Sequence, residues 1–228
     1  MAGEGGIRLS PIRTGTADLK NMPPTYGSQQ PCDRAQLHAA RQRVACPQRD
    51  KPWVLASAIL GSSLAFIEGS VVNLALPAIQ QALEIDSAAV QWVMNAYLLV
   101  LGSFMLVGGS LGDRVGLRRI FILGNAVFGL GALGCAVAPS LPLLIAARCV
   151  QGLGGALLVP ASLALIGSYF TEAERGKAIG TWAGASALTT AVGPVLGGWL
   201  VDQWGWPAVF WLVAPFAVLT LSLAAWRV

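Results

Sequence analysis

The sequence predicts an all-α membrane protein with six transmembrane helices. Only 11% of its 228 residues are charged and 55% are hydrophobic, whereas a soluble domain carries about 25% charged residues. Beyond position 52 the apolar residues form runs of roughly twenty, the length at which a helix crosses a bilayer core of about 30 Å. A soluble helical bundle would need a polar stripe along each helix, and none of the six runs has one.

Short polar breaks separate the apolar runs and set the order of the predicted spans. Acidic residues occupy the first break, a basic loop over 111–119 follows the second run, and a mixed loop over 167–177 follows the fourth. The spans are expected at 53–76, 89–110, 120–138, 142–166, 178–201 and 207–226. Together they form a predicted transmembrane bundle over residues 52–228.

Residues 1–51 differ from the rest of the chain. They hold eight of the fifteen Lys and Arg residues, four acids, the single histidine and no apolar run. This composition fits neither a secretory signal nor an acid-free transit peptide, and it predicts a basic, disordered cytoplasmic tail. Two alternatives stay open: a basic helix over Asp33–Arg49 lying on anionic lipid, or an over-long start of the sequence.

Charge in the loops predicts the orientation of the bundle. The second and fourth breaks carry Arg114, Arg118, Arg119, Arg175 and Lys177, whereas the breaks on the other side carry Glu84, Asp86 and Asp202 and no cation. Cationic loops stay on the cytoplasmic side of a membrane. We therefore expect a multi-pass protein of the plasma or inner membrane with both termini in the cytoplasm.

The residues that could carry chemistry exclude several functional classes. The four cysteines form no CxxC pair and only one histidine is present, so no metal or haem site and no cofactor is predicted. We expect all four cysteines to be unpaired. No nucleotide-binding loop or nucleophile–histidine pair occurs, which disfavours an enzyme. Because topology accounts for the basic residues, no nucleic-acid partner is expected.

An internal repeat relates the two halves of the predicted bundle. The stretches GGSLGDRVGL (Gly108–Leu117) and GGWLVDQWGW (Gly197–Trp206) share five of ten residues at an offset of 89. Three spans separate them, an odd number, so the copies have opposite orientations in the membrane. This pattern predicts a 3+3 inverted repeat, the building block of many secondary transporters.

Four stretches resemble motifs of the major facilitator superfamily, in the right order along the chain. GSLGDRVGLRR (Gly109–Arg119) resembles the loop between spans 2 and 3. FIEGSVVNLALP (Phe66–Pro77) is similar to the span-1 motif of the drug:proton antiporter branch with fourteen helices. LIAARCVQGLGGA (Leu144–Ala156) resembles the span-4 motif, and GPVLGG (Gly193–Gly198) the end of the span-5 antiporter motif.

The chain also departs from the family pattern. Glu68 and Ser70 stand where the family usually has Asp and Thr, and both substitutions keep the chemistry. Ala185 and Thr189 replace two glycines of the span-5 motif. Family members have twelve or fourteen helices, so the resemblance implies that these six form the N-terminal half of a major facilitator fold.

Two ionisable residues lie well inside the predicted spans. At 1.5 Å per residue, Glu68 lies about 12 Å and Arg148 about 9 Å from the outer membrane surface, and the resemblance implies that their spans face each other. Because a charge at mid-membrane is costly, we interpret Glu68 as the carboxylate that titrates a proton or recognises a cation. Arg148 pairs with it in this hypothesis and Gln151 extends the polar face; a purely structural ion pair stays open. Asn73 is expected to form a hydrogen bond between helices.

Two further groups of residues are predicted to control conformational change. The resemblance implies that the loop forms a cytoplasmic gate in which Asp113, near a helix N-terminus, locks against the other half of the transporter. The gating residues are Gly109, Asp113, Arg114, Gly116, Arg118 and Arg119. In span 5, small residues let helices approach closely and a proline can bend the helix; these are Gly180, Gly184, Gly193, Pro194, Gly197 and Gly198.

The resemblance implies a secondary transporter that exports amphipathic or cationic compounds in exchange for protons. Its partners would be the lipid bilayer, the substrate, protons and a second six-helix half. Alternatives are a non-transporting or truncated membrane protein, or a metabolite porter of the same fold.

Overall fold

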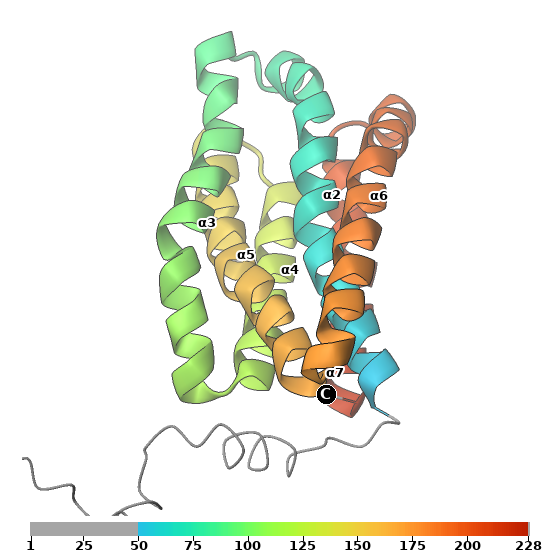
Figure 1. The fold of residues 1–228 in the computed structure, drawn as a ribbon. Helices are drawn as coiled ribbons and strands as arrows, with labels where there is room; N and C mark the ends of the chain where they lie inside the picture. The colour runs from blue at the N-terminus through green and yellow to red at the C-terminus, as the bar shows by residue number, and fades with distance from the viewer. Residues whose placement is uncertain (1–49, 228) are drawn as a thin grey trace, which may run out of the picture. The chain divides into compact units, whose positions relative to one another are not determined.

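The computed structural model describes residues 50–227 and contains six helices in this part of the chain (Figure 1). All six are long and apolar enough to cross a membrane, which confirms the predicted all-α membrane fold. The predicted tail, with Cys32, Cys46 and the possible basic helix, lies outside the described residues except for its last two positions. The helices are α2 (Lys51–Leu83), α3 (Ser87–Val115), α4 (Leu117–Ala136), α5 (Leu141–Tyr169), α6 (Glu172–Trp204) and α7 (Pro207–Arg227).

Most of the helices extend beyond the predicted spans, because capping groups rather than hydropathy end them. Helix α2 continues to Leu83 and stops where Glu84 adopts a left-handed conformation with φ of 53°. Helix α3 begins where the Asp86 carboxylate accepts a hydrogen bond of 2.6 Å from the Ala89 amide. At the other end of α3, residues 111–115 are helical, so the predicted loop over 111–119 is wrong. A single residue, Gly116, joins α3 to α4.

Helices α2, α4 and α5 are the more buried helices of the bundle, and α3, α6 and α7 are the more exposed. Helix α5 packs mainly against α4 and α3, while α2 packs mainly against α6 and also against α5 and α7. Helices α4 and α7 pack against each other. Helices α3 and α6 leave most of their surface exposed, as their positions in Figure 1 suggest.

The packing follows the predicted inverted repeat. Exchanging α2–α4 with α5–α7 maps the contact of α3 with α5 onto that of α6 with α2, and the contact of α4 with α5 onto that of α7 with α2. The contact of α3 with α5 and that of α6 with α2 are both made at glycines that occupy equivalent positions of the repeat. A Cβ on Gly108 would lie 2.2 Å from the Ala156 oxygen of α5, and one on Gly197 would lie 2.6 Å from the Val71 Cγ1 of α2.

The repeated motif also ends two helices in the same way. Gly116 ends α3 with φ of 105°, and Gly205 ends α6 with φ of 77°. Each donates its amide to the carbonyl four residues earlier, at 3.0 Å and 2.9 Å. L side chains rarely adopt these conformations, so the glycine shared by both copies has a structural reason.

Candidate functional site

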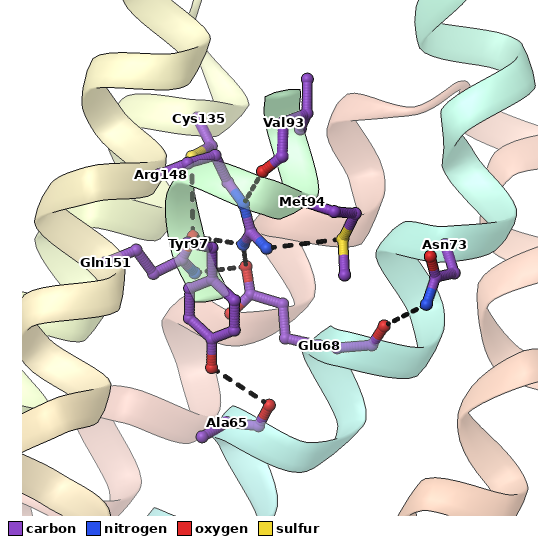
Figure 2. A network of polar contacts seen from close by, with 10 residues as sticks. Ala65, Glu68, Asn73, Val93, Met94, Tyr97, Cys135, Arg148 and Gln151 are labelled. Atoms are coloured by element: carbon purple, nitrogen blue, oxygen red, sulfur yellow. Dashed lines mark hydrogen bonds and ion pairs between the residues drawn. The ribbon is translucent and has the colours of Figure 1, made fainter. Parts of the chain in front are cut away.

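A buried ion pair joins α2 to α5 in the middle of the bundle. The Nη1 atom of Arg148 lies 2.8 Å from the Oε1 atom of Glu68, and both side chains are fully buried. Figure 2 shows the two side chains reaching toward each other from their helices. The pair neutralises two charges that would each be costly alone in the membrane.

Gln151 completes the cluster from the next turn of α5. Its Oε1 atom accepts a hydrogen bond of 2.8 Å from Arg148 Nη1, and its amide donates a hydrogen bond to Glu68 Oε1. The structure therefore brings together all three residues that the sequence singled out for coupling (Figure 2).

Helix α3 supplies support for Arg148 that the sequence did not indicate. The guanidinium donates from Nε to the Val93 carbonyl at 3.0 Å and lies 4.3 Å from the centre of the Tyr97 ring, a cation–π arrangement. The Tyr97 hydroxyl contacts the Ala65 carbonyl at 3.5 Å. A backbone carbonyl leaves no mark in a sequence, and Tyr97 lies in an apolar run. Arg148 is thus held by groups that do not depend on Glu68.

The two carboxyl oxygens of Glu68 have different surroundings. Oε1 receives both Arg148 and Gln151. Oε2 is buried and has no hydrogen-bond partner among residues 50–227. A buried polar atom without a partner is uncommon and costly. The cluster therefore leaves one acceptor free for a proton or another donor.

The predicted gating residues lie where α3 turns into α4. Asp113 is exposed in the last turn of α3, and its predicted contact with a helix N-terminus of the other half stays a prediction. Within the described residues its carboxylate makes no hydrogen bond or ion pair. Arg118 instead caps α7 by donating to the Ala225 carbonyl at 2.8 Å, which is favourable at a helix C-terminus. Arg114 and Arg119 are exposed.

The small residues of α6 divide into two groups. A Cβ on Gly193 would lie 2.1 Å from Ser70 Oγ of α2, and one on Gly197 would lie 2.6 Å from Val71 Cγ1, so these glycines allow the two helices to approach. Gly180, Gly184 and Gly198 have open space around them in the described part of the chain. Helix α6 continues through Pro194, which is exposed.

Other polar side chains inside the bundle make structural contacts. Ser62 and Ser162 join α2 to α5 at 2.7 Å, and the Asn125 amide donates to the Ala217 carbonyl of α7 at 2.8 Å. Asn73 donates to the Gly69 carbonyl of its own helix at 3.1 Å. Among the described residues Asn73 therefore joins no second helix. Cys135 and Cys149 form no disulfide within the described part of the chain.

The comparison with known families decides the class of the protein. A model of the Major Facilitator Superfamily matches residues 58–228. The chain belongs to this family. The family consists of transporters, not enzymes, which agrees with the sequence motifs.

Relatives in this superfamily include proteins named for drug resistance. The chain is 41% identical over 165 residues, which are 72% of the chain, to the multidrug resistance protein Stp of Mycobacterium tuberculosis. It is 37% identical, over 76% of its length, to the tetracenomycin C resistance and export protein of Streptomyces glaucescens. The aligned region spans only 31% and 32% of these two relatives.

A solved transporter structure shows the same fold. The peptide transporter POT in complex with sulfate matches 81% of the chain with a TM-score of 0.71 and 17% identity, and the match covers 40% of that transporter. The six helices therefore have the arrangement of part of a major facilitator transporter. The fourteen-helix branch remains a prediction.

Proposed function

We propose that the chain forms the first six-helix half of a secondary active transporter that exports small amphipathic or cationic compounds in exchange for protons. The observation that carries this proposal is the buried cluster of Glu68, Arg148 and Gln151 in a bundle of the Major Facilitator Superfamily. The names of the relatives support export of drug-like compounds.

Glu68 is the proposed proton-carrying group. A proton bound to its carboxyl removes the charge that Arg148 neutralises, and the attraction between α2 and α5 weakens. Arg148 retains its contacts with Gln151, the Val93 carbonyl and the Tyr97 ring, so it stays in place while Glu68 is released. Loss of the proton restores the ion pair. The two states differ in the contact between α2 and α5, which is a physical basis for coupling.

The exposed residues at the α3–α4 turn are proposed to bind a second half. Asp113, Arg114 and Arg119 present an acid and two cations at one end of the bundle, and they lie free among the described residues. Alternating access requires two bundles that move against each other, and such a charged surface suits a contact that opens and closes. We place this end, with both termini, on the cytoplasmic side of the cell membrane.

Reconstitution tests the proposal directly. The chain is placed in vesicles with an imposed pH gradient, alone and together with the C-terminal half of a full-length relative, and efflux of a fluorescent cationic dye is measured. We expect proton-driven efflux from the combined halves and its loss in Glu68→Gln.

The matched control is Glu84→Gln, which removes an exposed carboxylate at the end of α2. It should leave efflux unchanged. Proton-driven efflux that survives Glu68→Gln would exclude Glu68 as the coupling group.

A further inference from the structure

A crevice runs between α6 and α7 from one end of the bundle toward its middle. At the end that carries the α6–α7 link, it is an open groove of about 490 Å³. Deeper in the bundle, α2, α6 and α7 surround a cavity of about 180 Å³, and Leu212 lines both spaces. The groove and the cavity therefore adjoin. The residues of the groove are Leu200, Trp204, Pro207, Ala208, Trp211 and Leu212.

The crevice has the length of one membrane leaflet and is open at its side. Along α6 it reaches from Trp204 to Thr189, which is about 22 Å at 1.5 Å per residue. A bilayer with its headgroups is about 40–45 Å thick, so one leaflet measures about 20–22 Å. Helices α6 and α7 make little contact with each other, and Phe216 at the deep end is 41% exposed. A lipid molecule can therefore enter the crevice sideways from the membrane.

The deep part of the crevice suits a hydrocarbon chain. Its two hydroxyls, of Ser63 and Thr189, lie 3.3 Å apart, and Thr189 also donates to the Ala185 carbonyl at 2.8 Å. The side chain of Glu68 is fully buried, so it presents no charge to an occupant. A cavity of about 150 Å³ holds the carbons of benzene, and this one accommodates a chain segment of about the same size. The rest of the wall is apolar and includes Leu60, Leu64, Ile67, Val209, Val213 and Phe216.

The outer part of the crevice suits a lipid headgroup that carries an ammonium. Trp204 and Trp211, one from each helix, are 63% and 52% exposed and line the groove. Aromatic faces attract ammonium groups, tryptophan most strongly. Neither indole N–H donates a hydrogen bond within the part of the chain that the structure describes, so both can donate to phosphate oxygens.

The charges at this end of the bundle disfavour an anionic headgroup. The links between helices at this end and the last turn of α6 carry Glu84, Asp86 and Asp202, and they contain no Lys or Arg. A surface of one sign attracts the opposite charge and repels its own. A headgroup that combines an ammonium with a phosphate is therefore favoured over one with a net negative charge.

We propose that this crevice binds one phospholipid with a zwitterionic ammonium headgroup. The ammonium would lie against Trp204 and Trp211, and one acyl chain would pass Leu212 into the cavity beside α2, where burial of its methylene groups is favourable. The site lies within one six-helix bundle. It depends neither on transport nor on a second half, and its readout is lipid binding rather than efflux.

Native mass spectrometry of the full chain in detergent tests the site. Phosphatidylethanolamine, phosphatidylcholine and phosphatidylglycerol with identical acyl chains are added at equal concentrations. The first lipid bound should be one of the two zwitterionic lipids, with an affinity roughly fivefold above that of phosphatidylglycerol, as expected from one cation–π contact. Equal affinity for all three, or tighter binding of phosphatidylglycerol, would overturn the proposal.

Variants at the groove test the headgroup contact. The double variant Trp204→Leu with Trp211→Leu should lower the affinity for the zwitterionic lipids to that for phosphatidylglycerol. Trp92→Leu is the matched control, because Trp92 is 52% exposed near the start of α3 and does not line the groove. It should keep the preference. An equal loss in the control would reflect general anchoring by tryptophan at the interface, and the proposal would be wrong.

Filling variants test the position of the acyl chain. Leu212→Trp narrows the junction of groove and cavity and Leu60→Trp fills the cavity from α2, so each should weaken binding of the first lipid. Leu130→Trp is the control, at a position of α4 that is 66% exposed and lines neither space. Circular dichroism checks that each variant is folded, and the groove variants decide if neither filling variant folds. Unchanged lipid affinity in both folded filling variants would overturn the proposal.

Dodecyltrimethylammonium separates a membrane lipid from a free cationic amphiphile. It carries an ammonium and an alkyl chain but no phosphate. We expect it to displace the first lipid only at concentrations well above that of phosphatidylcholine, because it leaves the indole N–H groups without an acceptor. Displacement at lower concentrations would assign the crevice to free cations, and the assignment to a phospholipid would fail.

Discussion

The two repeats of the bundle share one arrangement of helices. They differ in how tightly α5 packs against α3 and α4 compared with how α2 packs against α6 and α7. Around α5, glycines allow α3 and α4 to approach closely. A Cβ on Gly152 would lie 2.6 Å from the backbone oxygen of Tyr97, and one on Gly154 would lie 2.3 Å from the backbone nitrogen of Phe128. Around α2, the equivalent space between α6 and α7 contains the cavity of about 180 Å³. We call these the packed side and the open side.

The comparison suggests a division of roles between the two helices of the ion pair. Arg148 belongs to the packed side, where α3 holds its guanidinium through a carbonyl and a ring. Glu68 belongs to the open side, where one carboxyl oxygen has no partner. In the proposed function, Arg148 keeps these contacts as the permanent cation, and Glu68 is the group that gains and loses a proton.

The largest effect is expected from breaking the pair that joins the two sides. Arg148→Gln leaves Glu68 buried without its cation, a change that costs about 3–5 kcal/mol in buried pairs. The double variant with Glu68→Gln removes both charges and should recover most of the lost stability. Thermal unfolding midpoints in one detergent measure both. A double variant that is no more stable than Arg148→Gln would contradict the importance of the pair.

A smaller loss is expected when a methyl group is added on the packed side. Gly154→Ala places a Cβ against the backbone of α4, and overpacking of this kind costs about 1–3 kcal/mol. Gly69→Ala makes the same change on α2, where nothing lies within 4 Å of the new atom. Unfolding midpoints should fall for Gly154→Ala and stay constant or rise for Gly69→Ala. Equal losses would show that the close approach of Gly154 to α4 does not cause the loss of stability.

Adding one methylene group should change the stability of the bundle in opposite directions on the two sides. Val213→Ile extends into the cavity and should stabilise the bundle by up to about 0.8 kcal/mol. Val93→Ile adds the same group to a fully buried position beside Arg148 on the packed side, and it should destabilise. The same unfolding measurement distinguishes them. A loss of stability in Val213→Ile would show that the open side has no spare volume.

The smallest effect is expected at the α3–α4 turn. Arg118→Ala removes the cap on the last turn of α7, an interaction worth about 0.3–1 kcal/mol. Arg119→Ala is the matched control, because this exposed neighbour has no partner among the described residues. Hydrogen exchange of the amides at the end of α7 should accelerate only in Arg118→Ala. Equal acceleration in both variants would indicate a general charge effect.

Periodicity and depth explain how much of this architecture could be predicted from sequence. Hydropathy located six spans, and a rise of 1.5 Å per residue placed Glu68 and Arg148 at matching depths. The repeat aligned Gly116 with Gly205, and both end a helix with positive φ. These features depend on one-dimensional spacing, which a sequence records directly.

Features that depend on three-dimensional contacts were not predictable. The Val93 carbonyl supports Arg148 through the backbone, which every residue carries. Helix α3 extends to Val115 because a polar sequence can continue a helix beyond the hydrophobic core. The cavity arises from the volumes of side chains on three helices, and no pattern within one helix reports their sum.

Infrared difference spectroscopy of the full chain in nanodiscs tests the central claim most directly, namely that Glu68 exchanges a proton inside the bundle. Carboxyl C=O bands are recorded on acidification for the unaltered chain and for Glu68→Gln, with Glu84→Gln as the control. We predict a band of a protonated buried carboxyl that is present in the unaltered chain and the control and absent from Glu68→Gln. Identical spectra for all three proteins over the pH range in which they remain folded would contradict the account.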